Sequence, residues 1–184
     1  NLQLDEILTL LVADGLVAAT DADTLARAPT RRAEHPLEIV AEKGWQAANK
    51  PRLALTLDWL VEWLAGKLGV PYLHIDPLKI DLTAVTQSMT NAYSERYRIL
   101  PVEVTKTTLT VATAEPFVRD WADELEKILN VKVKLAFANP QDIRRYLGEF
   151  YNLARSMKKA QESAPGEISL ARNFEQLVAL GQLD

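Results

Sequence analysis

The stretch Gly66–Asp81 (GKLGVPYLHIDPLKID) limits the possible folds of this chain more than any other part of it. Gly69 is typical of a helix end, and the two prolines that follow it prevent the helix from resuming. The residues between these prolines, Tyr72–Asp76, have the pattern of a short extended segment. Before this stretch the apolar residues recur at helical spacing, whereas beyond it helix and strand patterns alternate. The stretch therefore predicts a joint between two packed subdomains.

The periodicity predicts an α+β protein with a helical subdomain at residues 1–69, an α+β subdomain at 70–160 and, at 161–184, a linker with the start of a following segment. In the first subdomain, four short amphipathic helices pair as two αα-hairpins. A glycine, Gly15 or Gly44, follows the first helix of each pair. The second pair is longer because it has an insertion ahead of its second helix.

The α+β subdomain should contain three strands, at Ile99–Val104, Thr108–Thr113 and Val131–Phe137. Helices are expected at Leu82–Arg98 (interrupted near Thr90), Phe117–Leu129 and 140–159. The first two strands form a hairpin, and we expect the helices to cover one face of a small three-stranded sheet. The pattern leaves open whether the third strand pairs with the first or the second. In the last helix, Ile143, Leu147 and Phe150 share the face that should pack against the sheet.

Composition and charge argue against several classes of function. Hydrophobic residues make up 48% of the chain and charged residues 25%, which is typical of a folded globular protein. The net charge of −4 and the pI of about 5.3 argue against nucleic-acid binding, which usually requires a basic face. The chain has no cysteine and therefore neither disulfides nor thiolate metal ligands. No apolar run approaches the roughly 18 residues of a membrane span, so we expect no direct membrane insertion.

The sequence contains no recognisable catalytic or cofactor-binding motif. A phosphate loop ends in Gly-Lys-Ser/Thr, whereas Gly66-Lys67 is followed by Leu68 inside a helix end. The two histidines, His35 and His74, lie far apart without acidic residues at metal-ligand spacing. We interpret His35 as a helix N-cap and His74 as a surface residue of an extended segment. The prediction is thus no catalytic residue, no metal and no bound cofactor in this chain.

A small basic cluster, Arg31 and Arg32 beside His35, lies in the loop between the two helical hairpins. Two interpretations are open. The loop is either solvated without a specific role, or it contacts an anion or an acidic partner. We therefore take Arg31, Arg32 and His35 as the candidate partner-binding residues.

Several blocks of the sequence carry a family resemblance. They are HPLEIVAEKG at 35–44, GVPYLHIDPLKID at 69–81, ILPVEV at 99–104, TVATAEPF at 110–117 and ANPQDIRRYLGEFY at 138–151. Together they resemble the N-terminal region of the type II secretion and type IV pilus assembly ATPases (the GspE/PulE family). The ending RNFEQLVALG at 172–181 is similar to the linker ahead of the ATPase core in such proteins.

The resemblance implies a non-catalytic docking and regulatory domain. In that case the chain stops before the Walker motifs, and ATP and magnesium are expected only in the missing core. The implied partners are the cytoplasmic domain of an inner-membrane platform protein and the ATPase core of the same chain. The implied location is the cytoplasmic side of the inner membrane, where the domain is held through its partner.

A cyclic di-GMP sensor is the alternative function that the resemblance implies. Some family members bind this ligand through tandem helical motifs that begin Arg-Leu-Gly and close with Gln. In this chain Glu6 and His35 stand at the arginine positions, and Leu8 and Leu37 stand at the glycine positions. An anionic ligand beside Glu6 would meet a carboxylate in place of the arginine cation of the motif. It would also lack the close approach to the backbone that the glycine of the motif allows. Both differences argue against binding.

Overall fold

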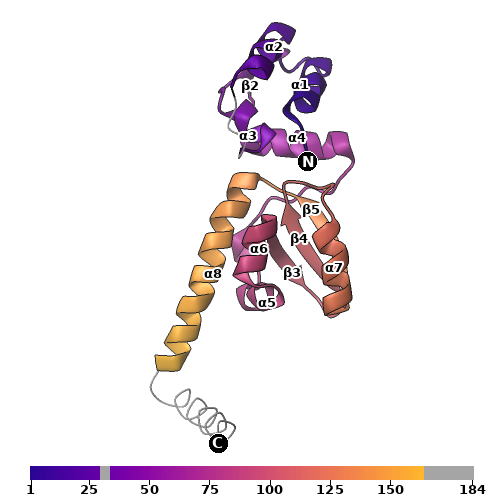
Figure 1. Cartoon of the computed structure of the whole chain (residues 1–184). Coiled ribbons are helices and arrows are strands. Elements are labelled where there is room, and N and C mark those ends of the chain that lie inside the picture. The colour runs from indigo at the N-terminus through magenta and orange to yellow at the C-terminus, as the bar shows by residue number, and fades with distance from the viewer. Residues whose placement is uncertain (30–33, 164–184) are drawn as a thin grey trace, which may run out of the picture.

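The computed structural model describes residues 1–29 and 34–163, and it has the predicted α+β architecture (Figure 1). The helices of the N-terminal part are α1 (Leu4–Ala13), α2 (Ala19–Arg27), α3 (Pro36–Ala41) and α4 (Leu57–Leu68). The second part contains, in chain order, α5 (Leu82–Ser88), α6 (Asn91–Tyr97), β3 (Ile99–Val104), β4 (Thr108–Thr113), α7 (Asp120–Leu129), β5 (Lys132–Phe137) and α8 (Pro140–Ser163).

The N-terminal part consists of the two expected helix pairs, in which α1 packs on α2 and α3 packs on α4. The backbone φ angles of Gly15 and Gly44 are 71° and 64°, a left-handed conformation that glycine adopts without strain after a helix. Between α3 and α4 the chain forms a small antiparallel sheet of β1 (Gln46–Ala47) and β2 (Lys50–Ala54). The sequence did not predict this sheet, because its strands are short and mostly exposed, without apolar alternation.

The joint after α4 is extended, as predicted. Gly69 ends the helix with a φ of 67°. The backbone of the joint then pairs with the end of β5, where the Leu73 N–H donates to the Phe137 carbonyl at 2.9 Å and the Phe137 N–H donates to the Pro71 carbonyl at 2.7 Å. A single turn of 3-10 helix, η1 (Pro77–Lys79), leads from there into α5. The joint is therefore hydrogen-bonded to the sheet.

The sheet has the order β3-β4-β5. Strands β3 and β4 form the predicted antiparallel hairpin, and β5 pairs with β4 in parallel. The parallel pairing answers the question that the sequence left open. Helix α7 carries the chain back across the sheet, so β5 starts at the same end as β4.

Helices cover both faces of this sheet, so the expectation of helices on one face was wrong. Ile99 and Leu100 are neighbours in β3 that point to opposite faces, and both are fully buried. Ile99 belongs to a small cluster with Trp121 of α7, whereas Leu100 belongs to a larger cluster with Phe150 of α8. The larger cluster also includes buried residues from all four N-terminal helices, so one apolar core continues across the joint.

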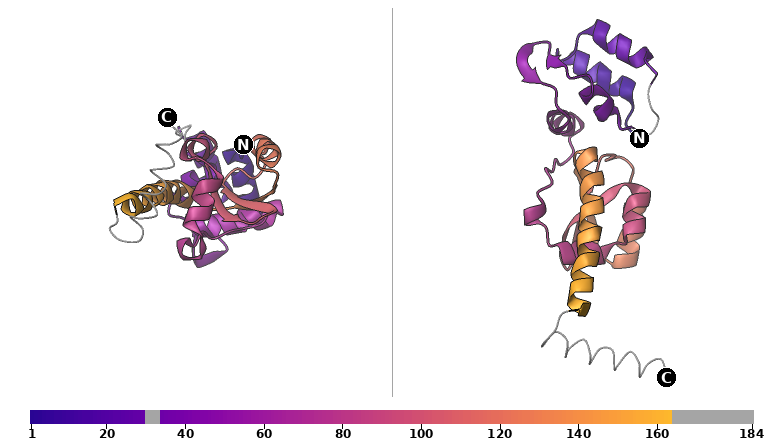
Figure 2. Two further views of the ribbon diagram at one scale, coloured as in Figure 1. Left: turned by 90° about the horizontal axis from the view of Figure 1, so that it is seen from below. Right: turned by 90° about the vertical axis from the view of Figure 1, so that its left-hand side faces the viewer.

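Helix α8 is the longest element, and it projects beyond the sheet (Figures 1 and 2). It continues to Ser163, so residues 161–163 are helical and not part of the predicted linker. The rest of the predicted linker and following segment, residues 164–184, lies outside the described residues. Within the part of the chain that the structure describes, no helix is both long and apolar enough to cross a membrane.

Candidate functional site

Of the three candidate partner-binding residues, the structure places only His35. Arg31 and Arg32 lie in the segment 30–33, outside the described residues. His35 is the N-cap of α3, as the sequence predicted. Its side chain, however, is buried between the two parts of the protein. His35 is therefore not a surface contact in this structure.

The imidazole of His35 bonds in two directions. Its Nδ1 accepts a hydrogen bond from the Leu37 N–H at 3.1 Å, and its Nε2 lies 2.8 Å from the carbonyl oxygen of Ala114. Both contacts are satisfied together only by a neutral ring that carries its proton on Nε2. Burial lowers the pKa of His35, which favours this neutral form, although the Ala114 carbonyl and the carboxylates of Glu115 and Glu38 act in the opposite direction.

Charged groups from both parts of the protein surround this ring. Glu38 is buried beside it and accepts a hydrogen bond from the His35 N–H at 3.1 Å, which completes a capping box on α3. The other carboxylate oxygen of Glu38 pairs with Arg144 of α8. Glu115 accepts from the Leu2 N–H at 2.8 Å. We call His35, Glu38, Glu115 and Arg144 the polar junction. It joins the helical part to the α+β part.

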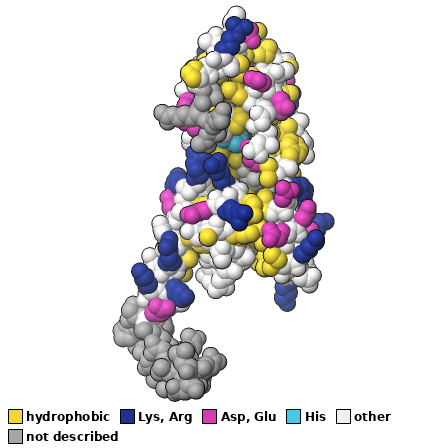
Figure 3. All heavy atoms as spheres, viewed as in Figure 1, with side chains coloured by type: hydrophobic (Ala, Val, Ile, Leu, Met, Phe, Trp, Pro, Cys, Tyr) yellow, Lys and Arg dark blue, Asp and Glu magenta, His cyan; other side chains and the backbone are white. Residues whose placement is uncertain are grey.

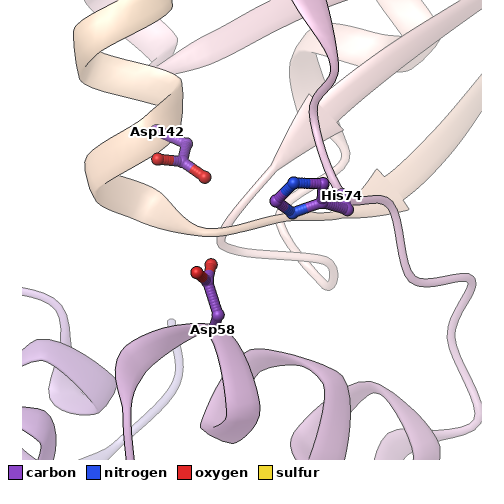
Figure 4. A group of neighbouring side chains, drawn as sticks. All are labelled: Asp58, His74 and Asp142. Atoms are coloured by element: carbon purple, nitrogen blue, oxygen red, sulfur yellow. The ribbon is translucent and has the colours of Figure 1, made fainter.

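A second polar group lies at the N-terminal ends of α4 and α8. Asn139 caps α8 through its side-chain oxygen, and its Nδ2 donates to Asp58 Oδ1 at 2.8 Å. Beside this contact, the side chains of Asp58, His74 and Asp142 face one another (Figure 4). Burial, followed by the charge of Asp58, raises the pKa of Asp142. We call these three residues the Asp-His-Asp group.

Sequence reasoning missed the Asp-His-Asp group because its members are distant along the chain and belong to three different segments. Asp58 lies in the first turn of α4, His74 in the joint and Asp142 in the first turn of α8. No signal in the sequence relates the three positions. Only the tertiary structure makes them neighbours.

The Gly66-Lys67 pair is helical, in agreement with its rejection as a phosphate loop. Both residues lie within α4, and the Lys67 ammonium is 2.7 Å from a carboxylate oxygen of Asp14 at the end of α1. That ion pair, with a hydrogen bond from Trp63, lowers the pKa of Asp14. Lys67 thus links two helices of the N-terminal part.

The projecting half of α8 presents apolar side chains to solvent. Leu153 and Met157 lie one turn apart on the same side of the helix and are 54% and 42% exposed. Basic side chains gather along this part of the molecule (Figure 3). The exposed Lys158 follows Met157 directly in the helix. We call Leu153 and Met157 with Lys158 the α8 surface.

Residues 68–157 match the model of the MshEN domain family. The chain is 32% identical over 178 residues to the type IV pilus assembly ATPase TfpB of Acinetobacter baylyi, covering 93% of this chain and 30% of TfpB. The chain thus spans less than a third of the length of this relative.

Two solved structures have a similar fold. The structure of MshE with cdg superposes with a TM-score of 0.56 at 17% identity, covering 82% of this chain and 100% of that one. The N-terminal domain of XpsE gives a TM-score of 0.50 at 17% identity, covering 80% of this chain and 96% of that one. The family match and the relative together confirm the resemblance seen in the sequence. Residues 68–157 match the MshEN domain family, and the chain is homologous to a type IV pilus assembly ATPase over 30% of the length of that protein.

Proposed function

We propose that this chain is the non-catalytic docking and regulatory domain of a secretion or pilus assembly ATPase, and that it links the motor to an inner-membrane platform. The main support is the homology to a pilus assembly ATPase of which the chain spans 30%. In this proposal the domain works on the cytoplasmic side of the membrane and is held there by its partner. The other 70% or so of such a protein has room for the motor core.

The α8 surface supports a docking role. Protein interfaces combine a buried apolar centre with a polar rim. Leu153 and Met157 supply such a centre, and Lys158 follows Met157 at its edge. This charge favours an acidic partner surface. We therefore assign the cytoplasmic part of the platform protein to this surface, with apolar residues opposite the helix and carboxylates at the edge.

Calorimetry of the chain against the cytoplasmic part of the cognate platform protein tests this assignment. The double variant Leu153→Ser, Met157→Ser should bind at least about 10-fold more weakly, because residues at an interface centre each contribute about 1 kcal/mol or more. The matched control is Leu78→Ser, which removes a 95% exposed leucine from η1 and should leave the affinity unchanged. Equal affinities of wild type and double variant would exclude the α8 surface. Absence of binding at high micromolar concentration, with both partners folded, would exclude the docking function.

The proposal also requires that this chain does not hydrolyse ATP. Lys67 lies within a helix and pairs with Asp14, so it is not placed to hold a phosphate. Purified chain should therefore show no ATP turnover above background. Turnover that survives removal of contaminating ATPases would contradict the proposal.

Cyclic di-GMP sensing is the alternative, and the fold shared with the structure of MshE with cdg favours it. The side chains at the motif positions argue against it. Leu8 and Leu37 are buried in the apolar core where the motif has glycine, and both nitrogens of His35 are already hydrogen-bonded. Titration with cyclic di-GMP should give no binding heat. Binding at micromolar concentration would replace the docking function with a sensor function.

A further inference from the structure

The Asp-His-Asp group has the chemistry of a metal site. It offers one imidazole nitrogen and two carboxylate oxygens, and these atoms all lie within 4.8 Å of one another (Figure 4). Mixed nitrogen and oxygen donors of this kind are bound by divalent transition-metal ions such as Zn²⁺, whereas Ca²⁺ and Mg²⁺ prefer oxygen alone. We propose that Asp58, His74 and Asp142 bind one divalent transition-metal ion.

The spacing of the three side chains fits an ion between them. Zn²⁺ lies about 2.0–2.2 Å from its nitrogen and oxygen ligands, so two ligand atoms are at most about 4.4 Å apart. The observed separations, all within 4.8 Å, are close to that range. Among the described residues, neither the carboxylate of Asp142 nor the ring of His74 has a hydrogen bond or an ion pair. The three groups therefore face one another without direct bonds that an ion would have to break.

The preference of helix N-termini for carboxylates does not by itself explain why these three side chains lie together. Asp58 and Asp142 each lie in the first turn of a helix, where the helix dipole favours a carboxylate with or without a metal. His74 belongs to neither helix, yet its ring points toward both carboxylates (Figure 4). The raised pKa of Asp142 reflects burial and repulsion by Asp58, a repulsion that a cation would remove.

The surroundings also fit a metal site. Asn139 donates to one oxygen of Asp58, the kind of outer contact that orients a metal ligand. Asp58 and His74 are exposed, so an ion can reach the group from solvent. Because its ligands come from α4, the joint and α8, a bound ion would cross-link the helical part to the α+β part. Metal binding would thereby stabilise this arrangement of the two parts.

Titration of the 184-residue chain with Zn²⁺ at about pH 7.5, where unperturbed histidine is neutral, tests the site. We expect one ion per chain. His74→Ala should weaken Zn²⁺ binding by more than about 10-fold, since loss of even an outer contact costs about 10–100-fold. Asp142→Asn should also weaken binding. The matched control is Asp120→Asn, which removes the same charge from the first turn of α7, away from the group.

Nuclear magnetic resonance gives a second readout, because the chain has only two histidines. Zn²⁺ should shift the ring signals of His74 and leave those of the buried His35 unchanged. Failure of wild type to bind Zn²⁺ at millimolar concentration would overturn the proposal. Equal Zn²⁺ affinity in wild type and His74→Ala would also overturn it, provided that circular dichroism shows both proteins folded.

Discussion

At the residue scale, His35 combines a local role with a long-range one. The local role is the N-cap of α3, which needs only the ring nitrogen that accepts from the Leu37 N–H. The long-range role is the contact from the same ring to the carbonyl of Ala114, 79 residues further along the chain. A protonated ring would still donate to Ala114 but could not accept from the Leu37 N–H, so only the neutral ring fills both roles and the protonation state of His35 is coupled to the cap of α3.

This coupling predicts how stability depends on pH. The pKa of His35 is lowered by burial in the folded chain, whereas the unfolded chain takes up this proton near pH 6.5. The unfolded state therefore binds more protons below that pH, and the free energy of unfolding should fall as the pH drops from about 7.5 to 5. His35→Asn retains a capping oxygen but has no titrating ring. Urea denaturation across this range should show a weaker pH dependence in His35→Asn than in wild type.

The same variant has a second expected effect at constant pH. Asn is too short to replace the contact with Ala114, so His35→Asn should lose about 1–3 kcal/mol of stability at pH 7.5, the cost of an unsatisfied buried polar group. Identical pH profiles in the two proteins would show that His35 is not the source of the pH dependence of the free energy of unfolding.

At the element scale, α8 changes character along its length. Ile143, Leu147 and Phe150 are buried against the rest of the protein, as their spacing predicted. Beyond Tyr151 the helix leaves the body, and Leu153 and Met157 continue the apolar residues into solvent. Periodicity identifies such a helix and its apolar residues, but it does not show where the packing partner ends.

Two alanine substitutions on α8 test this change of character. Phe150→Ala should reduce the free energy of unfolding by roughly 3–5 kcal/mol, because it leaves a cavity next to Tyr146, whose ring centroid is 5.5 Å away. Leu153→Ala should stay within about 0.5 kcal/mol, since this side chain is mainly in solvent. Chemical denaturation of the two variants measures both values. A loss below about 1 kcal/mol for Phe150→Ala would mean that α8 does not pack as described.

At the scale of the whole molecule, the two parts share a core and also have separate features. The larger apolar cluster continues from the N-terminal helices into β3 and α8, and the polar junction adds hydrogen bonds between the parts. The smaller cluster around Trp121 lies entirely in the α+β part. The boundary at residues 69 and 70 stays a prediction.

Expression of residues 70–163 alone tests this boundary. The fragment should unfold cooperatively, because the sheet and the cluster around Trp121 are complete within it. It should also be less stable than the whole chain, because its share of the larger cluster loses the cover of the N-terminal helices. Differential scanning calorimetry compares the two proteins. A fragment without a cooperative transition would show that the chain is one domain.

The sequence by itself determined the features that depend on near neighbours. Glycine and proline placed the joint, periodicity placed the helices of both parts, and His35 was identified as a cap, because caps, turns and amphipathic faces are set by residues a few positions apart. The sequence blocks that carry the family resemblance also pointed to the family.

Only the tertiary structure decided what depends on contacts between distant segments. These features are the parallel pairing of β5 with β4, the helices on both faces of the sheet, the polar junction and the Asp-His-Asp group. Asp58 and Asp142 are 84 positions apart, and no local pattern relates them. Their proximity results from the burial of one apolar core that includes residues of both α4 and α8. Hydrophobic burial is not directional, so residue types alone do not specify which polar groups it brings together.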